Sequence, residues 1–536
     1  MDSVIYDPLE EFDGKYKALH QEKTNQFFET LVQRSGIDIE KNRETVRLYD
    51  THIETVAKLR KKRNWRRFWR VLMCITVILI PLVIWKMTPK IRSLKSQIEE
   101  SDQQAEKLLA EAGAQMAPLN RLFTDRDALD IIESTIPLIT FHPCFSAEQE
   151  ADMKINYDFA ANREQEQSTL DVLAGHYNEN PFLFENKVIH TMGMETYHGY
   201  KTIHWTETYR DSNGKLRTRT RSETLHATVT KPKPFYSTQV ELNYCSQGGP
   251  DLEFSRDATH LHQKNERELE RYVRRGERKL NRKAEKALRQ NDDFVSMSNS
   301  EFEVLFDALN RTDEVQFRTL FTPLAQTNMV SLICSQSGYG DDFHFVKMKR
   351  TNRILTNHSQ GRAINLLPNR YMSYSYDIAK ENFIGQNMEF FKAVYFDFAP
   401  VLAIPAYQER PVHSLKPIPD RSQMYSLKEC EVLANAVDPQ YVMHPNTKTK
   451  AILKSTFVES KDSVDTTRIT AYSYDIEKRV DVITMRGGDG HLHSVPVEWD
   501  EYLPLEAENY FCISAKELAA NKTVMARRNG LCIYRT

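Results

Sequence analysis

The sequence lacks the local motifs that identify common enzymes and metal sites. It has no Gly-rich phosphate loop joining a strand to a helix, no nucleophile elbow and no CxxC pair at zinc-site spacing. Its seven cysteines are widely scattered, which permits disulfides without predicting any. It also has no internal repeat and no low-complexity tract. These absences favour a globular protein whose function has to be sought in side-chain clusters.

Net charge is nearly absent as well. The formal charge is −2 over 536 residues, so any electrostatic function must come from local clusters of charge. The acidic, polar first residues do not have the pattern of a cleavable signal peptide. Hydrophobic residues make up 40% and charged residues 27% of the chain, the composition of a globular protein long enough for several domains.

Long hydrophobic runs are missing except for one, Val71 to Trp85, which reads VLMCITVILIPLVIW. It is apolar on every face, has cations on both sides, and is flanked by tryptophans as membrane spans are. A buried core helix is the alternative, because the strict run is short for a bilayer. We expect a single transmembrane helix over residues 67–87, with the lipid bilayer as a partner.

Charges beside this run predict its orientation. Eight lysines and arginines lie between positions 58 and 70, against four between positions 86 and 95. The positive-inside rule therefore predicts a cell-membrane protein with a cytoplasmic N-terminus and the C-terminal domain outside. The scattered cysteines argue the other way, since free thiols suit a reducing compartment.

The fold class expected is α+β, with a single transmembrane helix, a helical N-terminal region, a short coiled-coil stalk and a large mixed domain containing antiparallel β-meanders. The expected parts are a helical region at 1–66, the transmembrane helix at 67–87, the stalk at 88–117, a β-rich subdomain at 118–250, a charged helical subdomain at 251–335 and a mixed α+β subdomain at 336–536.

Helical periodicity governs the first third of the chain. Residues 1–66 carry apolar stripes at helical spacing, which predict a hairpin packed on itself or on a protein partner. Residues 91–112 have apolar side chains at alternating spacings of three and four. This heptad predicts self-association through a coiled coil, or else a helix lying on the next domain.

Period-two alternation marks the β-rich part. Residues 200–209 and 216–229 read as two strands joined by the turn Asp211-Ser212-Asn213-Gly214. Gly487-Gly488-Asp489-Gly490 also lies between strand-like runs, so it predicts a hairpin turn and not a phosphate loop.

Histidines supply the metal candidates. On a strand, His-x-His presents two imidazoles on one side, so His491 with His493, helped by Asp489, could bind a cation, as could His260 with His262. Exposed histidines without a metal are the alternative. The histidines of the meander could also cluster; they are His190, His198, His204 and His226. The sequence assigns no catalytic residue and no cofactor.

A basic helix is the most concrete candidate for binding. Residues 266–289 carry an apolar stripe bordered by cations, among them Arg274, Arg275, Arg278 and Arg282. A polyanion would suit this surface, although mixed-charge helices are often simply solvated. No specific nucleic acid is predicted. We expect a membrane-anchored binding or scaffold protein of unknown ligand that is not an enzyme. A metal-dependent or hydrolase-like enzyme using the β-region histidines and a polyanion-binding protein are the alternatives.

Overall fold

A computed structural model describes residues 5–74, 88–159, 166–290, 297–308, 310–411, 416–418, 422–515, 524–528 and 530–535. The chain divides into two compact units. Unit 1 comprises residues 1–139 and 365–396, and unit 2 comprises residues 140–364 and 397–536. Helices and antiparallel sheets are both abundant, so the mixed α+β content expected from the sequence is confirmed.

Unit 1 is helical. Its elements are α1 (Pro8–Glu11), η1 (Phe12–Tyr16), α2 (Lys17–Ser35), α3 (Ile39–Cys74), α5 (Thr88–Asn120), α6 (Asp127–Thr135), η5 (Pro368–Arg370) and the part of α12 (Tyr376–Leu402) that precedes residue 397. The core forms where the apolar stripe of α2 meets α12: Phe28 lies 5.3 Å from Phe383 between ring centroids, and His20 stacks on Phe391 at 3.9 Å. Burial lowers the pKa of His20 to about 3, so this imidazole is a neutral core residue.

The predicted transmembrane helix is contradicted. Among the described residues no helix is long and apolar enough to cross a membrane. Residues 67–74 form the end of α3, a largely polar helix that begins at Ile39, so its described part lacks the roughly 20 apolar residues that a span needs. The remainder of the predicted span, residues 75–87, lies outside the described residues. The single-pass membrane fold expected from the sequence is therefore corrected to a mixed α+β fold.

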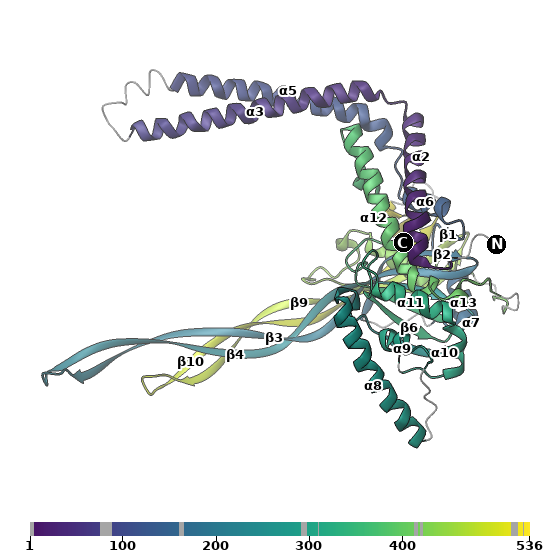
Figure 1. Ribbon diagram of the computed structural model, residues 1–536. Coiled ribbons are helices and arrows are strands. Elements are labelled where there is room, and N and C mark those ends of the chain that lie inside the picture. Colours follow the sequence, from purple (N-terminus) through teal and green to yellow (C-terminus); the bar gives the residue numbers. More distant parts are fainter. Residues whose placement is uncertain are drawn as a thin grey trace. The chain divides into compact units, whose positions relative to one another are not determined.

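The heptad of the predicted stalk lies in α5, which runs antiparallel to α3 (Figure 1). Leu94 and Ile98 on α5 are only 4% and 3% exposed. His52 and Ser101 hydrogen-bond across the pair at 3.1 Å, and Arg60 forms an ion pair with Asp102 at 2.9 Å. In this structure α3 of the same chain occupies the apolar seam. Self-association through residues 91–112 remains a prediction.

Shortening an apolar side chain in this seam should destabilise the hairpin formed by α3 and α5. We expect Leu94→Ala to cost about 2–5 kcal/mol, because it removes a buried side chain and leaves a cavity between the helices. Hydrogen exchange of the α5 amides should accelerate accordingly. Glu99→Ala is the matched control, since Glu99 is exposed on the same helix. Equal exchange in the two variants would contradict the packing described for α3 and α5.

Unit 2 contains two antiparallel sheets. The first has the order β1-β2-β3-β4-β7-β6-β5 and the second the order β11-β12-β10-β9-β8. The strands of the first sheet are β1 (Ile139–Phe141), β2 (Gln167–Tyr177), β3 (Asn180–Arg210), β4 (Leu216–Cys245), β5 (Glu253–Arg256), β6 (Phe343–Met348) and β7 (Thr351–Thr356). Those of the second are β8 (Ile452–Lys461), β9 (Val464–Arg486), β10 (Leu492–Ser514), β11 (Val524–Arg528) and β12 (Leu531–Arg535).

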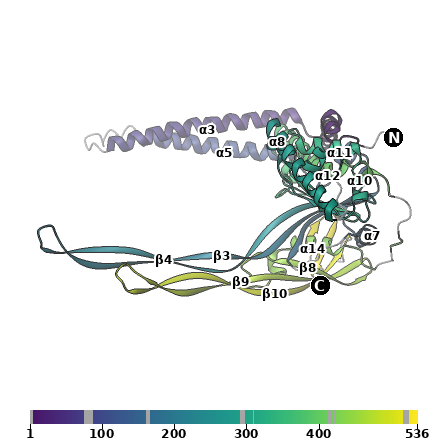
Figure 2. The ribbon, with the colours of Figure 1, turned by 60° about the horizontal axis from the view of Figure 1, so that its bottom comes forward.

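Two long hairpins extend from these sheets and lie side by side in both views (Figures 1 and 2). The β3–β4 hairpin turns at residues 211–215 and the β9–β10 hairpin at residues 487–491, as their turn sequences predict. The hairpins pack through a small apolar cluster that includes Ile203, Leu225 and Val497. Gly488 donates its N–H to Glu223 at 2.6 Å, which fixes the second turn against the first hairpin.

Helices surround the sheets of unit 2. They are α7 (Ala147–Tyr157), η4 (Leu261–Gln263), α8 (Glu266–Gln290), α9 (Ser300–Phe306), α10 (Glu314–Leu320), α11 (Pro323–Cys334), the end of α12, α13 (Pro405–Gln408), α14 (Leu427–Asn435) and η6 (Pro439–Tyr441). Six cysteines of this unit are free thiols; they are Cys144, Cys245, Cys334, Cys430, Cys512 and Cys532.

Candidate functional site

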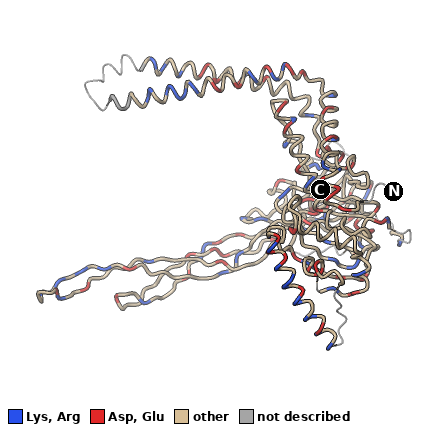
Figure 3. Tube along the Cα trace, in the orientation of Figure 1, with Lys and Arg blue, Asp and Glu red and all other residues tan. Residues whose placement is uncertain are grey.

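The basic helix predicted from the sequence is α8, and its first turn is closed by reciprocal hydrogen bonds. The Asn265 side chain accepts from the Glu268 N–H at 3.0 Å, and the Glu268 carboxylate accepts from the Asn265 N–H at 3.2 Å. Acidic residues occupy this end, where they complement the helix dipole. Most of the cations follow further along the helix, toward its negative end (Figure 3).

One face of α8 packs on α9. Leu280 and Ala287 are buried in one apolar cluster with Val304, and Gly276 lies next to the Val304 side chain. A Cβ atom at position 276 would lie 2.3 Å from a methyl carbon of Val304, so a larger residue could not maintain this contact. The apolar contact holds α8 at a fixed distance from α9 and thereby positions the cations beside it.

Nine of the ten lysines and arginines of α8 form two rows at a spacing of four residues. The first row contains Arg267, Arg271, Arg275, Lys279 and Lys283, and the second contains Arg274, Arg278, Arg282 and Lys286. Residues four apart in a helix are neighbours, so the first row makes four repulsive pairs and the second makes three. Each such pair destabilises a helix by roughly 0.2–0.5 kcal/mol. Bound anions would relieve this repulsion.

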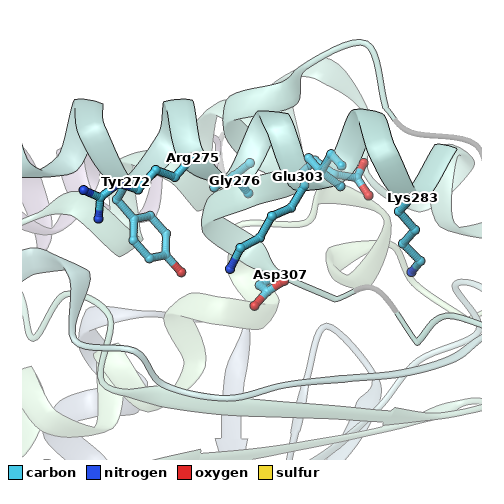
Figure 4. Close-up of a pocket in the computed structure, with 9 residues that line it drawn as sticks. Tyr272, Arg275, Gly276, Lys283, Glu303 and Asp307 are labelled. Atoms are coloured by element: carbon cyan, nitrogen blue, oxygen red, sulfur yellow. The ribbon is translucent and has the colours of Figure 1, made fainter. Parts of the chain in front are cut away.

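The first row borders a cavity of about 390 Å³ between α8 and α9. Arg275, Lys279 and Lys283 line it together with Tyr272, whose ring projects from α8 (Figure 4). A second hollow of about 250 Å³ shares Arg275 and Tyr272 with the first and continues toward the start of the helix. The two hollows together form a groove along α8, which we call the α8 groove.

Two carboxylates also line the cavity, and they differ in their partners. Glu303 is buried, forms an ion pair with Arg311 and accepts the N–H of Met297 at 2.8 Å, so its charge is already compensated. Asp307 directly follows α9 and is more exposed than Glu303. Partial burial raises the pKa of Asp307, and the positive charges of Arg256, Lys279 and Lys283 oppose this rise. Three cations therefore face one carboxylate that has no ion-pair partner of its own among the described residues, so the lining of this cavity carries an excess of positive charge.

The structure separates the four predicted polyanion-binding arginines. Arg275 borders the α8 groove, whereas Arg274, Arg278 and Arg282 belong to the second row and are exposed outside it. Arg274 also lies 3.7 Å from Glu270. Asp307 was not among the predicted site residues. No signal in the sequence places it beside α8, because that proximity depends on how α9 packs.

The metal candidates at the β9–β10 turn come only partly together. The His493 Nε2 lies 3.0 and 2.9 Å from the two carboxylate oxygens of Asp489, whereas His491 contributes its backbone N–H to this carboxylate. The hydrogen bond from His493 is the main cause of the lowered pKa of Asp489. This arrangement is that of a turn closed by a hydrogen bond between a histidine and a carboxylate.

The other His-x-His pair lies on a short helical turn, η4, and not on a strand. The rings of His260 and His262 are 6.1 Å apart, and the His262 Nδ1 accepts the N–H of Asp341 at 3.0 Å. In the β-meander, His198 and His226 hydrogen-bond at 2.8 Å on the exposed surface of the β3–β4 hairpin. Within the described ranges, no three histidine, cysteine or acidic side chains gather as a metal site would require.

Comparison with known proteins adds no assignment to this geometry. No protein-family model matches the chain, and searches of curated proteins and of solved structures find no significant similarity.

Proposed function

We propose that the protein is a binding protein and that the α8 groove, together with the second row of cations on α8, binds an anionic polymer. The observation that supports this proposal is the pair of cation rows that run along one helix beside a groove. A chain of regularly spaced anions could contact both rows, whereas a single small anion would neutralise only part of either.

The dimensions of α8 agree with a polymeric ligand. Arg271 and Lys283 are twelve residues apart, which corresponds to about 18 Å along a helix. Tyr272 offers an aromatic face within the same groove. An enzymatic function has less support, because the predicted histidines do not gather around a common point.

Removing four cations from α8 should weaken binding strongly. We expect the variant Arg274→Ala, Arg275→Ala, Arg278→Ala and Arg282→Ala to bind inorganic polyphosphate at least about tenfold more weakly at low salt, since each arginine that neutralises an anion releases counterions. Alanine retains the helix, so the fold should be preserved. Fluorescence anisotropy with labelled polyphosphate measures the affinity.

A matched variant tests whether overall charge is sufficient. Replacing Lys58, Lys61, Lys62 and Arg67 with alanine removes the same charge from exposed positions on α3. The proposal expects this variant to bind polyphosphate like the wild type. Equal losses of affinity in the two variants would show that binding follows overall charge and would reject α8 as the site.

A further inference from the structure

A second cavity in unit 2 is built around a pair of histidines that no sequence motif indicated. His142 follows β1 and His176 lies near the end of β2. The His142 Nε2 and the His176 Nδ1 are 2.7 Å apart. The strands approach closely here because Gly175 has no side chain: a Cβ atom at that position would lie 2.2 Å from the Thr140 carbonyl oxygen.

The hydrogen-bond network determines where each imidazole carries its proton. The Gln149 Oε1 accepts the N–H of Ser146 at 2.9 Å in the capping box of α7, so the Gln149 Nε2 is the donor to the His142 Nδ1 at 2.6 Å. The neutral His142 therefore carries its proton on Nε2 and donates it to the His176 Nδ1. As a result, the neutral His176 carries its proton on Nε2 and can donate one hydrogen bond from that atom.

These histidines line a cavity of about 260 Å³. Phe145, Met153 and Phe182 supply apolar walls. Glu148 and Asp152, one helical turn apart on α7, supply two carboxylates, while the lining contains no lysine or arginine among the described residues. The Asp152 Oδ1 accepts a hydrogen bond from Asn156 at 2.7 Å, which holds the carboxylate in place.

The charge of this cavity is opposite to that of the α8 groove. Burial lowers the pKa of His176. The negative charges of Asp152 and Glu179 raise this pKa by less than burial lowers it, so the ring is neutral at pH 8. The two carboxylates then set the local charge. A ligand that fits must bring a positive group for the carboxylates and an oxygen that accepts the hydrogen bond from His176.

We propose that this cavity is a binding site for a small organic cation that carries a primary ammonium group and a nearby hydroxyl or carbonyl oxygen. The ammonium group binds Glu148 and Asp152, the oxygen accepts a hydrogen bond from the His176 Nε2–H, and the short carbon chain packs against Phe182. The volume of about 260 Å³ lies just below the usual range of ligand pockets, about 300–1,000 Å³, which restricts the ligand to a few heavy atoms.

Ethanolamine is the probe, because it combines an ammonium group with a hydroxyl on two carbons. Calorimetric titration of the full chain at pH 8 and constant ionic strength should show saturable binding. Ethylene glycol lacks the ammonium group and ammonium chloride lacks the hydroxyl, so both should bind at least about tenfold more weakly. Absence of saturable binding, or equal binding of ethylene glycol, would overturn the proposal.

Variants locate the site. Asp152→Asn keeps the shape of the side chain and its acceptor for Asn156, and it should weaken ethanolamine binding about tenfold or more. Asp158→Asn removes a carboxylate at the end of the same helix, where it contacts Arg350 at 2.8 Å outside the cavity, and should bind like the wild type. Equal affinity of Asp152→Asn and the wild type would reject the cavity as the site. If Asp152→Asn failed to fold, the three probes on the wild type would still decide the ligand class.

Discussion

Replacing Asp341 with alanine is expected to lower the free energy of unfolding of unit 2 by about 3–5 kcal/mol. Asp341 and Arg256 form an ion pair in which both side chains are almost completely buried, and Arg256 also lies over the ring of Phe343 at 4.3 Å. Burial favours the protonated carboxyl, but Arg256 and several hydrogen bonds outweigh it and lower the pKa of Asp341. Removing the carboxylate leaves a buried, uncompensated charge on Arg256.

Asp341 also organises the loop that precedes α8. Its carboxylate accepts from the backbone N–H groups of Thr259 at 3.0 Å and Leu261 at 3.1 Å. The control is Asp257→Ala, because Asp257 is 88% exposed on the same loop, and it should change stability by less than about 0.5 kcal/mol. Urea unfolding followed by circular dichroism measures both variants. A double variant, Arg256→Met with Asp341→Leu, should recover much of the loss in stability if the unpaired charge is its cause.

Replacing Glu429 with glutamine should remove a pH dependence of stability. Glu429 is 1% exposed, and its Oε2 accepts the N–H of Phe145 at 2.9 Å. Burial, opposed by this hydrogen bond, raises the pKa of Glu429 to about 7. Ionising this buried carboxyl is therefore unfavourable, while glutamine keeps the acceptor for Phe145 and carries no charge.

The direction of the effect follows from proton linkage. Between about pH 4.5 and 7 the folded protein keeps a proton on Glu429 that the unfolded chain releases, so stability falls as the pH rises through this window. The free energy of unfolding of Glu429→Gln should be higher than that of the wild type by up to about 3 kcal/mol at pH 8, and the two should be equal near pH 4. Urea unfolding at a series of pH values measures the difference. A difference that stays constant from pH 4 to pH 8 would contradict the raised pKa.

Local sequence patterns predicted individual helices, strands and turns better than they predicted which of these segments pack together. The turn at residues 211–214 and the helical stripe of α2 were predicted correctly, since turn residues and apolar spacing act within a few positions. The hydrogen bond between Gly488 and Glu223 joins residues far apart in the sequence, and one sequence does not reveal such pairing. The heptad of α5 was recognised but its partner α3 was not, because a heptad indicates that a seam exists and not which helix fills it.

The predicted transmembrane helix and the α8 site also show that a local sequence pattern does not reveal its structural surroundings. Hydropathy drew attention to residues 67–87, but the described end of that run is a continuation of the charged helix α3. For α8, the cation rows are visible in the sequence, whereas the groove depends on the packing of Gly276 against Val304. His142 and His176 lie on neighbouring strands whose register the sequence does not define, so their pairing could not be predicted.

The salt dependence of polyphosphate binding tests the proposed function most directly. A logarithmic plot of affinity against salt concentration should have a steep negative slope for the wild type, because neutralised anions release counterions. The variant without Arg274, Arg275, Arg278 and Arg282 should have a slope shallower by about 3, because each cation bound to a single-stranded polymer contributes roughly 0.7 to the slope. A wild-type slope near zero, or the same slope in both proteins, would contradict binding of an anionic polymer by α8.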